Sequence, residues 1–211
     1  MNLFFDLDGT IADTDPDIRG AWRAAIEEEG LVCPRFEELF IAGPPFEEMA
    51  KILFPGRNDY EELASRLRLR FAAHYDHDGF PQTREYPGVR EELRRLKTSG
   101  HRLFIVTNKR YPGTLAIARH FGWGEFFDGF YSGDMHRDDE IGILKKPALL
   151  KLVMREVGAS AADSVMIGDT RLDFEAGKAN GLKTFAVIWG YGTRAEAALA
   201  DVIIEHLPFP F

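Results

Sequence analysis

Short apolar segments alternate with helical segments along most of the chain, and this alternation limits the possible folds. Predicted strands lie at residues 3–5, 102–106, 129–132, 164–167, 183–189 and 201–204. Predicted helices lie between them at residues 88–97, 112–121, 147–157 and 174–180. Buried strands that alternate with helices are typical of a parallel sheet covered on both faces. We therefore expect an α/β fold built on a doubly wound parallel sheet.

An all-helical block interrupts this pattern after the first strand. Asp15 and Pro16 predict a helix start, with Asp15 as the N-cap and Pro16 at the first helical position. Further helical patterns cover residues 36–41, 46–54 and 60–75. A polar connector that contains glycine and proline follows at residues 76–81. We therefore expect an α-helical domain at residues 15–81, inserted into an α/β core formed by residues 1–14 and 82–211.

Composition and charge limit the partners and the compartment. Of the 211 residues, 45% are hydrophobic and 28% are charged, which is ordinary for a globular protein. The formal net charge of −8 argues against nucleic acid and anionic membranes as the main partners. Cys33 is the single cysteine, which excludes an internal disulfide and fits a reducing compartment. Because the chain shows neither a signal peptide nor an apolar run of ~20 residues, we expect a cytoplasmic location.

Polar residues stand where three of the predicted strands end. They are Asp6, Asp8, Thr107, Asn108, Asp169 and, one turn further along the chain, Asp173. In open parallel sheets the reactive groups lie beyond the carboxyl ends of the strands, so we expect these side chains to meet. Carboxylates that converge on one spot favour a hard divalent cation, and such oxygen ligands suit Mg²⁺. Lys145, Lys146 and Pro147 precede a predicted helix, and one of the two lysines can point at the same crevice.

These residue types suit phosphoryl transfer. The oxygens of a phosphoryl group need neutralisation by Mg²⁺ on one side and by an ammonium with hydroxyl or amide donors on the other. One carboxylate can then attack phosphorus and form an aspartyl-phosphate, which splits the displacement into two steps. A second carboxylate can protonate the leaving alkoxide and later take a proton from the attacking water.

Four ordered segments of the chain resemble the motifs of the haloacid dehalogenase superfamily. They are residues 5–10 (FDLDGT), 106–108 (VTN), 146–147 (KP) and 167–173 (IGDTRLD). The helical block between the first two segments is similar to the small helical cap of phosphoglycolate phosphatase-like members. The similarity spans nearly the whole chain. It implies a haloacid dehalogenase-like α/β core with an inserted cap and a Mg²⁺-dependent phosphatase activity.

The resemblance also implies roles for the acidic residues. Asp6 matches the nucleophile that becomes phosphorylated, and its other oxygen would bind Mg²⁺. Asp8 matches the general acid/base and would bind the metal through its backbone carbonyl. Asp169 matches a direct metal ligand, and Asp173 matches an outer-shell or water-mediated ligand.

A second group of residues would bind the phosphate and the rest of the substrate. By resemblance, Thr107 and Lys146 would bind the phosphate, with the Asn108 amide beside them. Asn108 could instead cap the turn that follows it. Thr10 can hydrogen-bond a neighbouring carboxylate or the turn, and we include it among the candidate substrate-binding residues. Arg110 could reach a substrate carboxylate or remain on the surface.

Two loops raise further possibilities. Gly43-Pro44-Pro45 joins two helices of the expected cap. In capped relatives such a loop looks into the active site and helps to choose the substrate, so Gly43 and Pro44 are candidate substrate-binding residues. Residues 136–140 contain metal-ligand residue types without ligand spacing, and we expect a solvated loop there.

The leading hypothesis is a Mg²⁺-dependent phosphatase that acts on a small phosphomonoester, with phosphoglycolate as the best substrate by resemblance. Gly43-Pro44-Pro45 and Trp189-Gly190-Tyr191-Gly192 also resemble nucleotide 5′-monophosphatases, and a sugar-phosphate mutase would use the same Asp6 and Asp8. Two alternatives come from other classes, a signalling receiver with a phosphorylated aspartate and an inactive metabolite-binding homologue. The expected partner is a small phosphorylated metabolite, and the protein would be a monomer or a homodimer.

Overall fold

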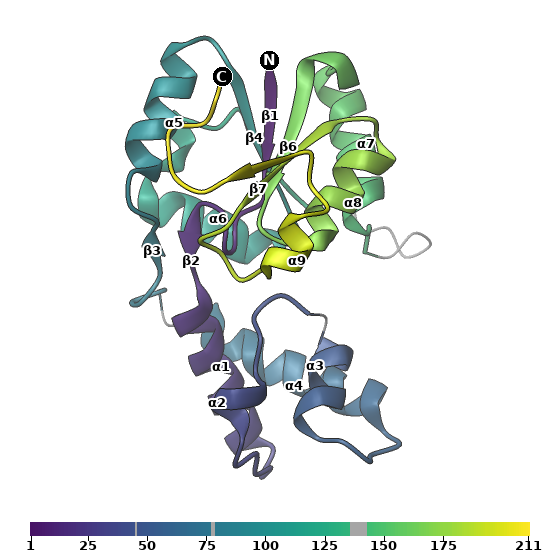
Figure 1. The fold of residues 1–211 in the computed structure, drawn as a ribbon. Helices are drawn as coiled ribbons and strands as arrows, with labels where there is room; N and C mark the ends of the chain where they lie inside the picture. Colours follow the sequence, from purple (N-terminus) through teal and green to yellow (C-terminus); the bar gives the residue numbers. More distant parts are fainter. Residues whose placement is uncertain (45, 77–78, 136–142) are drawn as a thin grey trace. The chain divides into compact units, whose positions relative to one another are not determined.

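The computed structural model describes residues 1–44, 46–76, 79–135 and 143–211, and the chain folds as two compact units (Figure 1). The larger unit combines Met1–Asp13 with Arg84–Phe211, and the smaller unit is Thr14–Thr83. Pro45 of the expected cap loop and the expected solvated loop at residues 136–140 lie outside the described residues. Among the helices of the described ranges, none has the length and apolarity needed to span a membrane.

The larger unit is built on a six-stranded sheet with the strand order β5-β4-β1-β6-β7-β8. Its strands are β1 (Asn2–Phe5), β4 (Arg102–Thr107), β5 (Gly129–Ser132), β6 (Ser164–Gly168), β7 (Lys183–Val187) and β8 (Val202–Ile204). Every neighbouring pair is parallel. The expected doubly wound parallel sheet is therefore confirmed.

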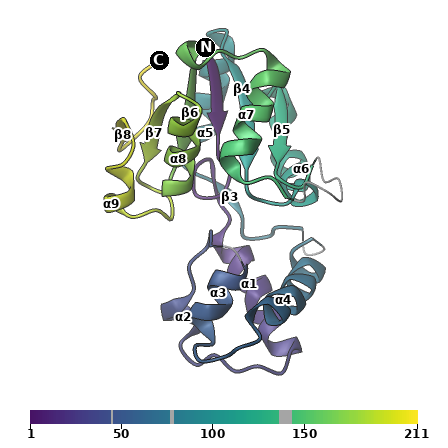
Figure 2. The same ribbon diagram turned by 90° about the vertical axis from the view of Figure 1, so that its right-hand side faces the viewer.

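Helices cover both faces of this sheet. Figures 1 and 2 show α5 (Val89–Thr98) and α6 (Tyr111–Phe121) on one face, with α7 (Lys146–Val157) and α8 (Arg171–Ala179) on the other. A short helix, α9 (Arg194–Ala197), follows β7, and two 3₁₀ turns lie at Trp123–Glu125 and Ala161–Asp163. The core under α7 and α8 is formed by Phe4, Phe104, Val106, Leu149, Leu150, Val153, Met166, Ala176 and Leu182.

The register of the central strand decides where the polar residues emerge. Phe5 pairs with Ile105 of β4 and with Ile167 of β6. The next residue, Asp6, is held at this edge because its backbone N–H donates to the Ile167 carbonyl at 2.9 Å. Asp6 therefore leaves the sheet between the carboxyl ends of two neighbouring strands, where Thr107 ends β4 and Asp169 follows β6.

A two-stranded antiparallel ribbon connects the larger unit to the segment that forms the smaller one. It pairs β2 (Ala12–Asp13) with β3 (Arg84–Glu85). Each strand has two residues, which is too short to produce a periodic hydrophobic pattern. This length explains why the sequence analysis did not predict the ribbon.

The smaller unit is helical. Its helices are α1 (Asp15–Glu28), α2 (Phe36–Leu39), α3 (Phe46–Leu53) and α4 (Tyr60–Tyr75). Trp22 of α1 stacks on Phe46 of α3 with a centroid distance of 4.5 Å, and Phe46 meets Phe71 of α4 edge-on at 5.2 Å. Aromatic side chains thus join three of the helices into one core.

Two helix starts differ from the predictions in their cap or by more than one residue. The N-cap of α1 is Thr14, so the prediction of Asp15 as N-cap is wrong. Asp15 is already helical, and its carboxylate accepts two hydrogen bonds from Arg19 one turn later. Helix α8 begins at Arg171, three residues before the predicted start, because Thr170 and Asp173 form a capping box at its first turn.

Candidate active site

The turn after β1 brings the first two aspartates to the sheet edge. The backbone N–H groups of Thr10 and Ile11 donate to the Leu7 carbonyl at 3.2 and 3.1 Å, which closes a tight loop. Gly9 adopts a φ of 78°, and a Cβ at this position would lie 2.2 Å from Asp169 Oδ2. Only glycine therefore allows this turn to pass so close to Asp169.

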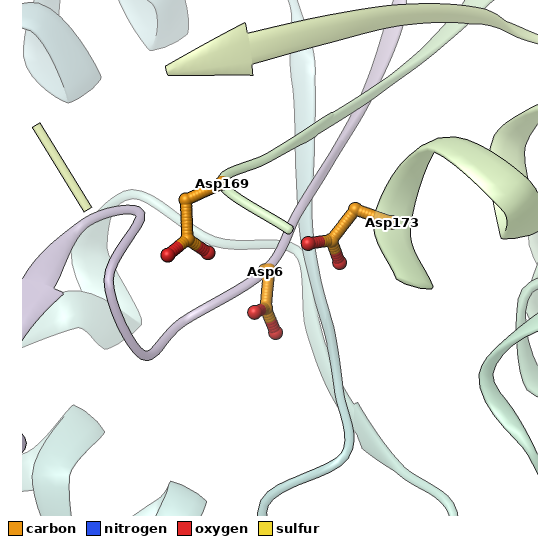
Figure 3. A group of neighbouring side chains, drawn as sticks. All are labelled: Asp6, Asp169 and Asp173. Carbon is orange, nitrogen blue, oxygen red and sulfur yellow. The ribbon is translucent and has the colours of Figure 1, made fainter. Parts of the chain in front are cut away.

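Three buried carboxylates meet at this edge. Asp6, Asp169 and Asp173 each offer one oxygen, and these oxygens lie within 4.8 Å of one another. Figure 3 shows that the three side chains come from separate places: Asp6 from the end of β1, Asp169 from the end of β6, and Asp173 from the first turn of α8. We refer to these three residues as the acidic cluster.

Lys146 places an ammonium inside the acidic cluster. It is the first residue of α7, and its side chain is only 3% exposed. Its Nζ lies 2.8 Å from Asp6 Oδ1 and 2.5 Å from Asp173 Oδ1. Burial on its own would lower the pKa of Lys146. The negative charges of Asp173 and Asp6 outweigh this effect, so the pKa of Lys146 is raised. The preceding Lys145 is exposed, so Lys146 is the lysine that reaches the carboxylates.

The acidic cluster holds more negative charge than one ammonium balances. Burial raises the pKa of Asp6 from 3.8 to about 6; the Lys146 charge opposes this rise, and the charges of Asp173 and Asp8 add to it. Burial also raises the pKa of Asp169 from 3.8 to about 8, with further contributions from Asp173 and Asp6. Both shifts report the cost of ionising a buried carboxylate beside others.

The donor set of the acidic cluster fits a hard divalent cation. Asp6 Oδ1 is buried and forms an ion pair with Lys146. Among the residues that the structure describes, no donor makes a hydrogen bond of good geometry to this oxygen. Carboxylate oxygens that converge within this spacing are the ligands that Mg²⁺ prefers. The clustered oxygens, together with the raised pKa values of Asp6 and Asp169, therefore fit a divalent cation bound at this edge of the sheet.

A glycine-containing loop after β7 orients Asp169. Asp169 Oδ2 accepts from the backbone N–H groups of Tyr191 and Gly192 at 2.7 and 3.4 Å. Asp169 Oδ1 accepts from the Thr10 hydroxyl at 3.3 Å. A Cβ on Gly190 would lie 2.5 Å from Asp169 Oδ2, and one on Gly192 would lie 1.8 Å from the Asp169 carbonyl oxygen. The sequence analysis noted this loop only as a substrate-related resemblance, although its two glycines signal close backbone contact.

Asp173 is engaged on both of its oxygens. Oδ1 pairs with Lys146, and Oδ2 accepts from the backbone N–H and the hydroxyl of Thr170 at 3.0 and 2.9 Å. Asp173 thus caps α8 and holds the Lys146 ammonium at the same time. These contacts suit the outer, water-mediated role that the resemblance implies for it better than direct coordination.

The last residue of β4 contributes a hydroxyl, and the segment after it contributes a second ammonium. Thr107 is 1% exposed, and its Oγ1 accepts from the Lys109 backbone N–H at 3.2 Å. Lys109 Nζ lies 3.0 Å from Asp8 Oδ1 and 3.3 Å from Asp8 Oδ2. Asn108 and Arg110 are exposed, and Arg110 is the N-cap of α6. The sequence analysis did not select Lys109, although its place two residues after Thr107 is a usable signal.

The remaining candidates lie in the smaller unit. Gly43, with a φ of 120°, and Pro44 belong to the segment between α2 and α3. Their part in substrate selection stays a prediction, as do the roles of Thr107, Asn108 and Arg110.

Known proteins resemble this chain along most of its length. It is 32% identical over 195 residues to a phosphoglycolate phosphatase of Nitrosospira multiformis, covering 90% of this chain and 83% of that protein. It is 32% identical over 214 residues to the pyrophosphatase PpaX of Halalkalibacterium halodurans, covering 98% and 93%. It is 28% identical over 193 residues to the tyrosine-protein kinase PtkA of Mycobacterium tuberculosis, where 90% of this chain spans 62% of that protein's length.

Solved structures share the same fold. A haloacid dehalogenase-like family hydrolase of Streptococcus pneumoniae superposes with a TM-score of 0.80 at 23% identity, covering 97% of this chain and 93% of that one. The sequence family described as haloacid dehalogenase-like hydrolase matches residues 3–187, a range that contains all four motif segments. The chain therefore belongs to the haloacid dehalogenase-like hydrolase family.

Proposed function

We propose that this protein is a Mg²⁺-dependent phosphatase that hydrolyses a small phosphomonoester through an aspartyl-phosphate on Asp6. The observation that supports this proposal most strongly is the meeting of Asp6, Asp169 and Asp173 around the Lys146 ammonium. This arrangement supplies a nucleophilic oxygen, an ammonium for a phosphoryl group and a set of oxygen ligands for a cation within one small volume.

The first half-reaction uses Asp6 and Asp8. An Asp6 carboxylate oxygen attacks phosphorus, and the bond from phosphorus to the ester oxygen breaks. The carboxylic acid of Asp8 gives its proton to the departing oxygen, so the leaving group departs as an alcohol. Lys146, already paired with Asp6, balances the negative charge of the transferring phosphoryl group, and the Thr107 hydroxyl hydrogen-bonds one of its oxygens.

The second half-reaction reverses the role of Asp8. Its carboxylate takes a proton from water, the water oxygen attacks phosphorus, and the bond from phosphorus to Asp6 breaks. Inorganic phosphate and the free Asp6 carboxylate result. Mg²⁺, bound by the acidic cluster with Asp8 contributing its backbone carbonyl, would supply the positive charge that brings a phosphate dianion next to these carboxylates.

Phosphoglycolate is the substrate that we propose first. Relatives named phosphoglycolate phosphatase are 32% and 30% identical to this chain. Other relatives bear the names of a pyrophosphatase and a tyrosine-protein kinase, so several phosphorylated compounds belong in the same test. The small helical unit, with Gly43 and Pro44 between α2 and α3, would act as the cap that selects the leaving group. We therefore propose a small phosphorylated metabolite as the substrate and the cytoplasm as the place of the reaction.

A substrate panel tests the proposal. Release of inorganic phosphate would be measured from phosphoglycolate, nucleoside 5′-monophosphates, sugar phosphates, pyrophosphate and an aryl phosphate, with Mg²⁺ and with EDTA. We expect Mg²⁺-dependent turnover, fastest on phosphoglycolate. Asp6→Asn serves as the matched control and should lose at least ~10³-fold, since it removes the attacking charge and keeps the shape.

Two results would contradict this assignment. Equal phosphate release by the Asp6→Asn variant would place the chemistry elsewhere. A phosphorylated protein that persists for minutes without turnover of any ester would favour the signalling receiver over the phosphatase.

A further inference from the structure

We propose that Lys109 is a positioning residue that holds the Asp8 carboxyl group in line for its proton transfers. The proposal deepens the phosphatase function proposed above and rests on it. Its basis is a contact that the sequence analysis did not predict: Lys109 Nζ lies 3.0 and 3.3 Å from the two oxygens of Asp8. One ammonium thus contacts both oxygens of the side chain that must move the proton.

The backbone around Lys109 is fixed on both sides. Its N–H donates to Thr107 Oγ1 at 3.2 Å, which ties it to the buried end of β4. Two residues later, the backbone N–H of Tyr111 donates to Asp134 Oδ1 at 2.9 Å at the start of α6. The long lysine side chain therefore starts from a well-defined point. Its stem is ordered by burial as well, since the side chain is only 6% exposed.

Burial makes the contact with Asp8 important for Lys109 as well. A lysine ammonium that has left water needs an anionic partner, because its desolvation costs several kcal/mol otherwise. Asp8 is 22% exposed and lies on the tight turn that begins at Leu7. The pair therefore joins that turn to the loop that carries Thr107, across about a hundred residues of sequence.

The two lysines of the site serve different carboxylates. Lys146 contacts Asp6 and Asp173, whereas Lys109 contacts Asp8. Asp6 and Asp8 are only two residues apart, so a single shared ammonium would draw the Asp8 side chain toward Asp6. A separate cation for Asp8 keeps this carboxyl group apart from the acidic cluster and holds it where it can face the leaving group.

A single-turnover experiment distinguishes this role from simple phosphate binding. With enzyme in excess and Mg²⁺ saturating, the rate of leaving-group release reports the first half-reaction alone. An alkyl phosphate needs the proton from Asp8, whereas 4-nitrophenyl phosphate, with an acidic phenol as leaving group, needs it far less. We expect Lys109→Met to slow the alkyl ester by at least ~10-fold and the aryl ester by less than about 3-fold, within the range of general acid catalysis.

Three comparisons complete the test. Lys109→Arg should restore most of the alkyl rate, since it keeps a cation beside Asp8. In an Asp8→Asn background, Lys109→Met should change neither rate by more than about 2-fold, because the group that it positions is already gone. Lys151→Met, which removes an exposed lysine of α7, is the matched charge control and should behave as the wild type.

The outcomes separate the two proposals. If the wild type releases neither leaving group with Mg²⁺, the phosphatase function fails. If the wild type is active and Lys109→Met slows both esters equally, or raises KM with kcat unchanged, then Lys109 binds the substrate phosphate and the positioning role is overturned. Independent effects of Lys109→Met and Asp8→Asn would overturn it as well.

Discussion

Replacing Asp6 with asparagine should stabilise the metal-free protein while abolishing its activity. The side chain of Asp6 is 10% exposed, and burial beside other carboxylates raises its pKa from 3.8 to about 6. At 1.36 kcal/mol per pKa unit, this shift corresponds to roughly 3 kcal/mol of strain in the native state once the group is ionised. Asparagine keeps the shape of the neutral acid and never ionises, so it avoids this strain.

The sign of the effect follows from proton linkage. Between pH 3.8 and about 6 the native protein binds more protons at Asp6 than the unfolded chain does. Stability from this group is therefore complete below the unfolded pKa and is lost as the pH rises through the folded pKa. The free energy of unfolding of the variant should exceed that of the wild type by about 3 kcal/mol at pH 8 and by less than about 1 kcal/mol near pH 4.

Urea unfolding in EDTA at pH 8 and at the lowest pH where the protein stays folded measures this difference. Asp163→Asn is the control, because Asp163 is 62% exposed and its loss should change stability by less than about 0.5 kcal/mol. Added Mg²⁺ should stabilise the wild type and leave the variant nearly unchanged. A variant that is equally or less stable than the wild type at pH 8 in EDTA would refute the view that Asp6 is strained by its neighbours.

Two further substitutions test the surroundings of the acidic cluster. Lys146→Met removes the ammonium that pairs with Asp6 and Asp173. It should destabilise the metal-free protein by roughly 3–5 kcal/mol at pH 8, an effect opposite in sign to that of Asp6→Asn. Urea unfolding measures the change, and an unchanged unfolding midpoint would argue against the ion pairs. Gly192→Ala would bring a Cβ within 1.8 Å of the Asp169 carbonyl oxygen, so the loop must move. For the Gly192→Ala variant we expect the Mg²⁺ concentration that gives half-maximal activity to rise at least ~10-fold. An unchanged concentration would show that this loop does not orient Asp169.

The sheet could be predicted because buried parallel strands are continuous apolar runs. The run before Thr107 is buried in the structure from Leu103 onward, and β5 matches its predicted bounds. The polar residues Thr107 and Asp169 marked the ends of β4 and β6 to within one residue, whereas β7 ends at Val187, two residues before the predicted end at residue 189. The ribbon of β2 and β3 could not be predicted, since two-residue strands depend on the fold that brings them together.

Helix boundaries were less predictable than helix existence. Asp15 is a preferred N-cap residue, but Arg19 one turn later competes for its carboxylate, and Thr14 takes the cap position. The start of α8 shows the converse, because Asp173 serves both as a cap and as a partner of Lys146. Local preference alone does not reveal which of two roles a carboxylate takes.

The acidic cluster could be predicted from topology, but its internal contacts could not. The carboxyl ends of neighbouring parallel strands share one sheet edge, so residues that follow two such strands, as Asp6 and Asp169 do, must lie close together. The contact between Lys109 and Asp8 depends instead on the path of two tight turns. The donation from the Tyr191 backbone to Asp169 depends on the loop after β7, whose shape no periodic pattern encodes.

The formal charges at the site show why both lysines matter for a divalent cation. Within the described ranges, the charged side chains of the acidic cluster and of its ion pairs are Asp6, Asp8, Asp169, Asp173, Lys109 and Lys146. Fully ionised, the four carboxylates and two ammonium groups leave two negative charges, which is the charge that one Mg²⁺ neutralises. Without the cation, protons take its place, which is what the raised pKa values of Asp6 and Asp169 express. With Lys146 alone, the same four ionised carboxylates would leave three negative charges, so Lys109 lowers the negative charge of the metal-free site by one.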